Sequence, residues 1–269
     1  MGARNGEGRQ GIQSIEVGAR LLEALAAEPR PMMLRDLAAA AGMPPAKAHR
    51  YLVSFARMGL VEQEPGSGRY GLGPFALQLG LAGLARLDPY RLALPVLEEL
   101  SAALDQTVAA AVWGNHGATI VRWLESSQPV TASLRTGAVM PLTRSATGRV
   151  FLAFLPPART AKLAREELLL NARAGLAPAS GDELARIVEQ TRRHGLARAT
   201  GDMVPGVSGL AAPVFDCNGA LVLALVALGY AGTFDATWDG PNAAALREGA
   251  MRLSARLGSA GGSSVEARR

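Results

Sequence analysis

The chain has 269 residues, of which 28 are Lys or Arg and 23 are Asp or Glu, so its formal net charge is +5 at pH 7. This length allows one large or two modest domains, and the charge is compatible with a nucleic-acid partner without requiring one. Cys217 is the single cysteine, which excludes an intrachain disulfide and a thiolate zinc cluster. Because no signal peptide and no run of ~20 apolar residues is found, we expect a cytoplasmic protein that does not enter a membrane.

The first part of the chain predicts a tail and one helix. Residues 1–11 contain four glycines and no periodic pattern, which indicates a disordered tail. From Ser14, a predicted N-cap, apolar residues recur at helical spacing until Pro29 ends the helix.

Residues 34–57 have the pattern of a helix-turn-helix. A helix over 34–41 is followed by Gly42, which suits a helix C-cap, and by a second helix that begins near Pro45. The apolar stripe of the second helix comprises Ala48, Tyr51 or Leu52, Phe55 and Met58. The residues left to face outward are Ala46, Lys47, His49, Arg50, Ser54 and Arg57. Such a face suits DNA recognition, although a solvated helix surface has the same pattern.

A β-hairpin is predicted directly after this helix pair. Strands over 59–64 and 69–72 enclose a turn at 65–68, which is typical of the wing that follows a recognition helix. The glycines from Gly66 to Gly71 also match the GxGxxG spacing of dinucleotide-binding loops. No helix begins at the last glycine, so we interpret this match as chance.

Residues 74–88 predict a linker helix that begins at Pro74. Leu77, Leu81 and Leu84 form an apolar face at helical spacing. This face could be buried by a second copy of the chain or by the core of the following domain.

From Pro89 onward the pattern becomes a mixture of helices and strands. Helices are expected at 90–104, 146–155, 157–169, 181–194 and 241–257, and strands at 107–113, 119–125, 130–134, 210–215 and 220–228. The turn from Asp216 to Gly219 joins the last two strands. Antiparallel strands interrupted by helices indicate an α+β sensor domain over 89–258, followed by a flexible tail at 259–269.

The sequence offers little for catalysis. His49, His116 and His194 lack the spacing of metal ligands, and neither a GxSxG nucleophile elbow nor a P-loop is present. We therefore predict no catalytic residue, no metal and no cofactor. An enzyme that uses a lone carboxylate such as Asp202, or a protein-interaction module, stays open as an alternative.

Short motifs recur along residues 13–258 in a definite order. They are Leu37-Ala38, Gly42, Ala48-His49-Arg50-Tyr51-Leu52, Gly59-Leu60-Val61, Gly137, Pro141-Leu142, Ser145-Ala146-Thr147-Gly148-Arg149, Leu152-Ala153, Gly206-Val207-Ser208 and Ala211-Ala212-Pro213-Val214-Phe215-Asp216. In this order the chain resembles the IclR-type family of bacterial transcriptional regulators. The resemblance implies a winged helix-turn-helix over 12–73, a linker helix over 74–88 and a GAF-like effector-binding domain over 89–258. It also implies a homodimer or tetramer that binds double-stranded operator DNA and controls a nearby catabolic operon.

Two groups of site residues follow from this resemblance. At the start of the recognition helix, Ala46 stands where the family often has serine or threonine, so one phosphate contact is absent. The positions expected to face DNA are Lys47, His49 and Arg50 on the recognition helix, with Ser54 on the same outward face, and Arg69 on the wing. The positions expected to line an effector pocket are Met140, Ala146, Thr147, Val207, Gly209, Val226 and Leu228.

The pocket positions indicate the chemistry of the effector. Members that bind small polar keto acids tend to carry Cys or Ser where Gly209 stands, and Ser where Val226 and Leu228 stand. The replacements here favour a small organic acid with an apolar or aromatic body, its carboxylate at the N-terminus of the helix after Ser145. Alternatively, these residues fill the core and the pocket is closed.

Overall fold

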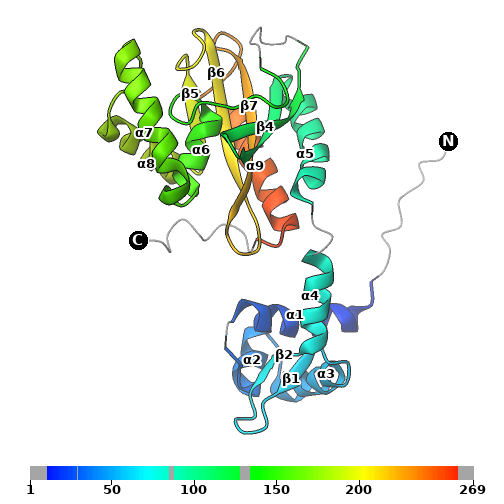
Figure 1. The fold of residues 1–269 in the computed structure, drawn as a ribbon. Helices are drawn as coiled ribbons and strands as arrows, with labels where there is room; N and C mark the ends of the chain where they lie inside the picture. Colours follow the sequence, from blue (N-terminus) through cyan, green and yellow to red (C-terminus); the bar gives the residue numbers. More distant parts are fainter. Residues whose placement is uncertain (1–10, 29, 85–87, 128–133, 260–269) are drawn as a thin grey trace, which may run out of the picture. The chain divides into compact units, whose positions relative to one another are not determined.

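The structure is a computed structural model that describes residues 11–28, 30–84, 88–127 and 134–259. The chain divides into two compact units, Met1–Leu87 and Asp88–Arg269, whose helices and strands are labelled in Figure 1. Each unit has its own cluster of buried apolar side chains. The tails predicted at 1–11 and 259–269 lie almost wholly outside the described residues.

The first unit is a winged helix-turn-helix, as predicted. Its elements are α1 (Gln13–Ala27), α2 (Leu34–Ala40), α3 (Pro45–Arg57), β1 (Val61–Gln63), β2 (Tyr70–Leu72) and α4 (Pro74–Leu84). Gly42 has φ +62° and ends α2, and Pro45 starts α3 at a position where a helix needs no N–H donor. β1 and β2 pair antiparallel to form the wing. Leu21, Leu37 and Leu52 hold the helices together, because all three are fully buried.

Two details of this unit differ from the sequence prediction. The amides of Ile15 and Glu16 bond to the carbonyl of Ile12, so α1 starts before Ser14 and Ser14 is not its N-cap. Met58 is the C-cap of α3 and is 57% exposed, so it does not belong to the buried apolar stripe.

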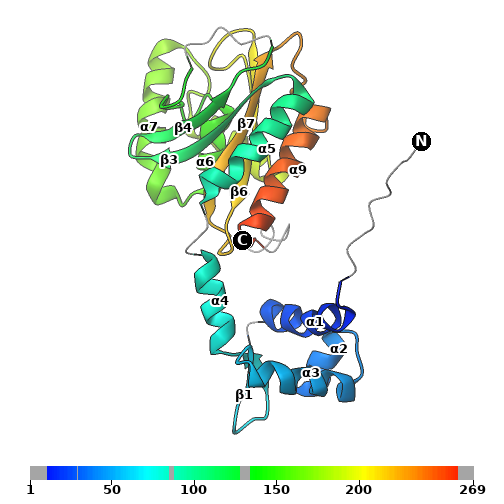
Figure 2. The same cartoon turned by 90° about the vertical axis from the view of Figure 1, so that its right-hand side faces the viewer.

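The second unit has helices on both faces of a sheet. Its helices are α5 (Pro89–Leu104), α6 (Ala146–Phe154), α7 (Pro157–Ala174), α8 (Gly181–His194) and α9 (Pro241–Arg256). Its strands are β3 (Thr107–Gly114), β4 (Gly117–Leu124), β5 (Ala197–Thr200), β6 (Val207–Phe215) and β7 (Leu221–Tyr230). In the described part of this unit the strand order is β4-β3-β7-β6-β5, with every neighbouring pair antiparallel. Helices α5 and α9 lie on one face and α6 on the other, as Figure 2 shows. This arrangement confirms the predicted α+β class.

The strands are less well predicted than the helices. β5 is absent from the prediction, although Ala197 and Ala199 are buried and Arg198 and Thr200 are not, which is a strand period. The strand has four residues, and among the described strands it pairs with β6 alone, so its signal is short. Of the strand predicted at 130–134, residues 130–133 lie outside the described residues, and Leu134 is not in a strand.

The start of α6 is fixed by the loop before it and by α7. The carboxylate of Glu167 accepts hydrogen bonds from the amides of Leu142 (2.8 Å) and Thr143 (2.9 Å). Asn171 Nδ2 donates to Thr143 Oγ1 at 3.0 Å. Gly148 lies against this loop so closely that a Cβ there would overlap the Pro141 carbonyl oxygen and Leu142 Cα. The first turn of α6 therefore has one position relative to the loop.

We predict that Gly148→Ala lowers the free energy of unfolding of the second unit by about 1–3 kcal/mol, because the added methyl group meets backbone that cannot rotate away. Scanning calorimetry of the full chain measures this change. Gly181→Ala in α8 is the matched control, since nothing lies within 4 Å of its new Cβ. Equal melting temperatures for the two variants would contradict the prediction.

Candidate functional site

The outward face of α3 carries the residues expected to meet DNA. At 3.6 residues per turn, Lys47, Arg50 and Ser54 lie on one side of the helix, while His49 points about 100° away from Arg50. All four side chains are exposed. Ser54 Oγ donates to the Arg50 carbonyl at 3.3 Å, so its hydroxyl proton is already engaged within the helix. The structure therefore groups three of these residues and sets His49 at the edge of the face.

Arg69 lies at the turn end of the wing, directly before β2. Its side chain is exposed, and Nη1 donates to the Pro31 carbonyl at 3.2 Å. This contact holds Arg69 against the segment that precedes α2, so its charge has a defined place next to the helix pair.

A pocket in the second unit brings together all seven positions expected to bind an effector. The pocket has a volume of about 50 Å³. The other residues in its wall are Leu134, Arg144, Ser145, Ala199, Asp202, Met203, Val204 and Ser208. Most of the side chains come from the start of α6, from β6 and β7, and from the segment between β5 and β6.

One wall of the pocket is the N-terminus of α6. Ser145 is the N-cap: its Oγ accepts from the Gly148 amide at 2.9 Å and donates to the Pro141 carbonyl at 2.6 Å. Ala146 and Thr147 follow in the first turn, and the Thr147 side chain is buried. Amide groups in a first helical turn lack intrahelical acceptors, so this wall favours an anionic group.

The opposite wall is apolar sheet. Val226 and Leu228 are two residues apart on β7 and so face the same side, and Leu228 pairs with Gly209 of β6. A Cβ at Gly209 would lie 3.6 Å from Leu228 Cβ and 4.0 Å from Ala146 Cβ, which are ordinary contacts. The missing side chain therefore leaves space that a ligand atom can fill.

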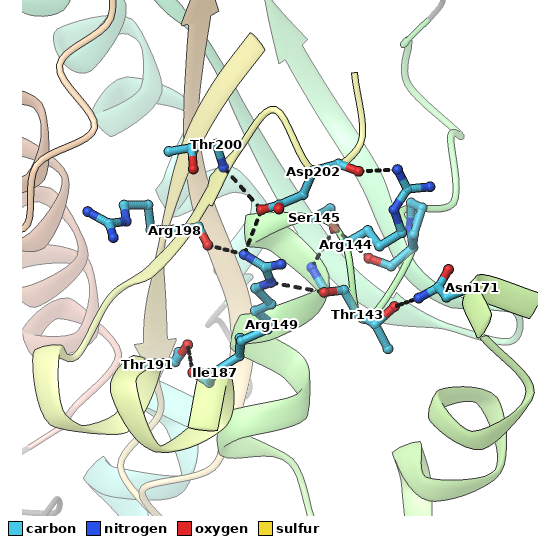
Figure 3. Close-up of polar contacts among 12 residues, drawn as sticks. Thr143, Arg144, Ser145, Arg149, Asn171, Ile187, Thr191, Arg198, Thr200 and Asp202 are labelled. Atoms are coloured by element: carbon cyan, nitrogen blue, oxygen red, sulfur yellow. Dashed lines mark hydrogen bonds and ion pairs between the residues drawn. The ribbon is translucent and has the colours of Figure 1, made fainter. Parts of the chain in front are cut away.

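An ion pair connects the pocket residue Asp202 to Arg149 of α6. Arg149 Nη1 lies 3.0 Å from Asp202 Oδ2, and the Arg149 side chain is only 6% exposed. Arg149 also donates to the carbonyls of Thr143 (2.9 Å, from Nε) and Arg198, as Figure 3 shows. Burial lowers the pKa of Arg149, and the neighbouring Asp202 carboxylate opposes that shift. The ion pair ties α6 to the segment after β5.

Arg144 is a cation of the pocket wall itself. Its Nη2 donates to the backbone carbonyl of Asp202, and its Nε is buried without a hydrogen-bond partner among the described residues. Sequence reasoning missed Arg144 as a pocket residue and considered Asp202 only as an isolated carboxylate. The sequence signal that could have identified Arg144 is its position directly before Ser145, the N-cap of α6.

A second cleft of about 290 Å³ adjoins this region. Its wall includes Arg149 and Asp202 together with Glu183, Arg186 and Gln190 of α8. Asp202 thus belongs to the walls of both cavities.

Among the residues that the structure describes, no three His, Cys, Asp or Glu side chains are grouped as metal ligands would be. No described helix combines the length and apolar character that a membrane crossing needs.

The winged helix and the pocket-bearing α+β unit together define a DNA-binding regulator with a ligand-binding domain. The family model for the IclR helix-turn-helix domain matches residues 14–65. The model described as bacterial transcriptional regulator IclR C-terminal matches residues 82–255. The chain belongs to the IclR family of bacterial transcriptional regulators, which confirms the family predicted from the sequence.

Individual relatives agree with this assignment. The chain is 34% identical over 205 residues to the glycerol operon regulatory protein of Streptomyces griseus, covering 76% of this chain and 80% of that protein. The crystal structure of Pseudomonas aeruginosa HmgR is 39% identical with a TM-score of 0.82, and the match covers 93% of this chain and 100% of HmgR. An IclR homologue from Microbacterium hydrocarbonoxydans, solved in complex with 4-hydroxybenzoate, shares the fold at 22% identity and a TM-score of 0.55, covering 91% of this chain and 98% of that one.

We predict that Asp202→Asn lowers the free energy of unfolding of the second unit by about 1–3 kcal/mol, because Arg149 then keeps a buried charge without a counter-charge. A fully buried pair would give more, ~3–5 kcal/mol, but Asp202 is 29% exposed and water screens part of the charge. Urea unfolding measures the change. Glu166→Gln, which removes an exposed carboxylate on α7, is the control; an equal effect of both variants would mean that the ion pair contributes nothing.

Proposed function

We propose that the protein is a homo-oligomeric regulator that acts in the cytoplasm, binds a two-fold symmetric operator near a catabolic operon and senses a small organic acid with an apolar, aromatic body. We infer no catalytic activity for it, since its relatives are named as regulators. One observation carries the proposal: seven positions separated by up to 88 residues meet around one pocket with an anion-binding wall and an apolar wall.

Operator binding is assigned to α3 and the wing. Lys47 and Arg50 share the exposed face of α3, and the small Ala46 at its start lets the helix backbone approach a groove. Arginine forms bidentate hydrogen bonds with guanine, whereas lysine acts mainly as a point charge toward phosphate. In this proposal Arg50 reads a base, and Lys47 and Arg69 position the domain.

Arg50→Ala should weaken operator binding by about 1–3 kcal/mol and relax specificity at one base pair, whereas Lys47→Ala should weaken binding to all sequences similarly. Mobility-shift titrations on operator and scrambled DNA separate the two effects. Arg165→Ala on α7 is the control, as an exposed arginine of the other unit. Footprinting that protects no site in the flanking promoter region, with or without ligand, would contradict operator binding.

Assembly into at least a dimer is assigned partly to α4. Leu77 is 64%, Leu79 52% and Leu81 56% exposed on this helix. Leu79 was not part of the predicted face, so α4 presents apolar side chains on more than one side. A second copy that covers them would also pair two recognition helices, which adds affinity and fixes half-site spacing.

Light scattering at micromolar concentration should therefore give at least twice the 28.0 kDa mass of one chain. Leu77→Lys with Leu81→Lys should shift the mass toward the monomer, because two buried ammonium groups oppose the contact. Leu170→Lys tests a comparably exposed leucine of α7. A monomer mass for the unchanged chain, both alone and with DNA, would overturn this assignment.

The effector is assigned from the two walls of the pocket. A carboxylate suits the first turn of α6, and an apolar body suits Val226 and Leu228. A cavity of about 150 Å³ holds one benzene molecule, so a ring needs the pocket to widen beyond its ~50 Å³. The segment from Gly201 to Gly206 supplies Asp202, Met203 and Val204 to the wall and has positive φ at both glycines. We infer that ligand entry displaces this segment.

A short keto acid is the second candidate, because the small volume admits it with little widening. Its additional oxygen atoms would lie against Val226 and Leu228, where each unpaired polar group costs about 1–3 kcal/mol. This cost favours the aromatic acid.

Thermal-shift measurements should show a higher melting temperature with aromatic acids than with short keto acids, and Val226→Ser should move the preference toward the keto acids. Val139→Ser, at a 47% exposed position outside the pocket wall, should leave the preference unchanged. Stabilisation of the unchanged protein by short acids alone would reject the aromatic effector.

A further inference from the structure

Arg144 has donors that the protein itself does not use. The side chain belongs to the pocket wall, at the position before the α6 N-cap Ser145. Nε and Nη2 form one edge of a guanidinium group, with two N–H bonds that point in parallel. On this edge Nη2 donates to the Asp202 carbonyl, while Nε is buried without an acceptor among the described residues. A backbone carbonyl thus serves one donor where a carboxylate would serve both.

The charges around the pocket leave a positive excess at Arg144. Among the described residues of the wall, Arg144 and Asp202 carry formal charges. The Asp202 carboxylate is paired with Arg149 at 3.0 Å and also accepts from the Thr200 amide at 3.1 Å. Arg144 contacts Asp202 through the backbone oxygen only, as the dashed line in Figure 3 shows. The site as a whole therefore favours a ligand with a single negative charge.

The position of the Asp202 carbonyl connects this edge to ligand entry. It belongs to the Gly201–Gly206 segment, which also supplies Met203 and Val204 to the wall. Movement of the segment to widen the pocket takes the carbonyl away from Nη2, and the guanidinium edge then lacks both acceptors. A carboxylate that enters at this point satisfies both donors.

We propose that Arg144 is the residue that binds the carboxylate of the effector, through a bidentate hydrogen bond from Nε and Nη2 that replaces the Asp202 carbonyl. This inference rests on the proposed acid-sensing function and adds the residue that selects a monoanion. Arg144 also becomes the link between ligand binding and release of the Gly201–Gly206 segment.

The test uses the full chain with benzoate and with benzamide, a neutral molecule of nearly the same shape. Calorimetric titration should give tighter binding of benzoate by the unchanged protein. Arg144→Gln should weaken benzoate binding about 10- to 100-fold and benzamide binding little, because only the charge-assisted hydrogen bonds are lost. Arg144→Lys, which keeps the charge without the fork, should fall between them. Arg165→Gln is the control for loss of one positive charge elsewhere.

The outcomes separate this inference from the proposed function. If Arg144→Gln binds benzoate as tightly as the unchanged protein, or loses benzoate and benzamide equally, Arg144 is not the carboxylate partner although acid sensing stands. Pyruvate serves as a second probe: if the unchanged protein binds pyruvate and not benzoate, the aromatic effector is wrong, and the effect of Arg144→Gln on pyruvate decides the role of Arg144. Binding of neither acid would reject both. Melting temperatures without ligand show whether each variant is folded.

Discussion

The second unit depends on the close contact between Gly148 and the backbone of Pro141 and Leu142. This contact lets the loop fold back over the first turn of α6, where the Glu167 carboxylate accepts hydrogen bonds from the loop amides. With the loop in place, Arg149 reaches the carbonyl of Thr143 and the carboxylate of Asp202. The helix N-terminus, the apolar strands and the segment after β5 thus converge on one pocket because one residue has no side chain.

The same contact explains why the pocket combines opposite properties. Backbone amides bind an anion best when the helix start is rigid, because a mobile helix end would have to reorganise around the incoming anion. Arg149 of α6 and Arg144, which precedes its N-cap, both contact Asp202 of the Gly201–Gly206 segment. Displacement of the segment therefore changes contacts at the start of α6. The pocket therefore has a rigid wall for recognition and a separate wall through which binding can alter the domain.

Sequence reasoning succeeded where the signal was local. The helix-turn-helix follows from Gly42, Pro45 and the spacing of apolar residues, all within about 25 residues, and α8 was predicted over its whole observed length. β5 was missed because it has four residues and, within the described part of the chain, pairs with β6 alone. The seven pocket positions came from the resemblance to the family, which carries spatial information that periodicity lacks. Arg144 was missed because its partner Asp202 is 58 residues away, and nothing in the intervening sequence indicates that the two meet.

The Arg149–Asp202 ion pair has a further consequence for the sheet. β5 is an edge strand, and exposed backbone groups on such a strand can pair with another chain. The Arg149 side chain donates to the Arg198 carbonyl, and the Asp202 carboxylate accepts from the Thr200 amide. These two backbone groups lie on the same side of β5. The ion pair that connects α6 to the segment after β5 therefore also gives two backbone groups of this edge strand a partner within the domain, and these two groups are not free to pair with another chain.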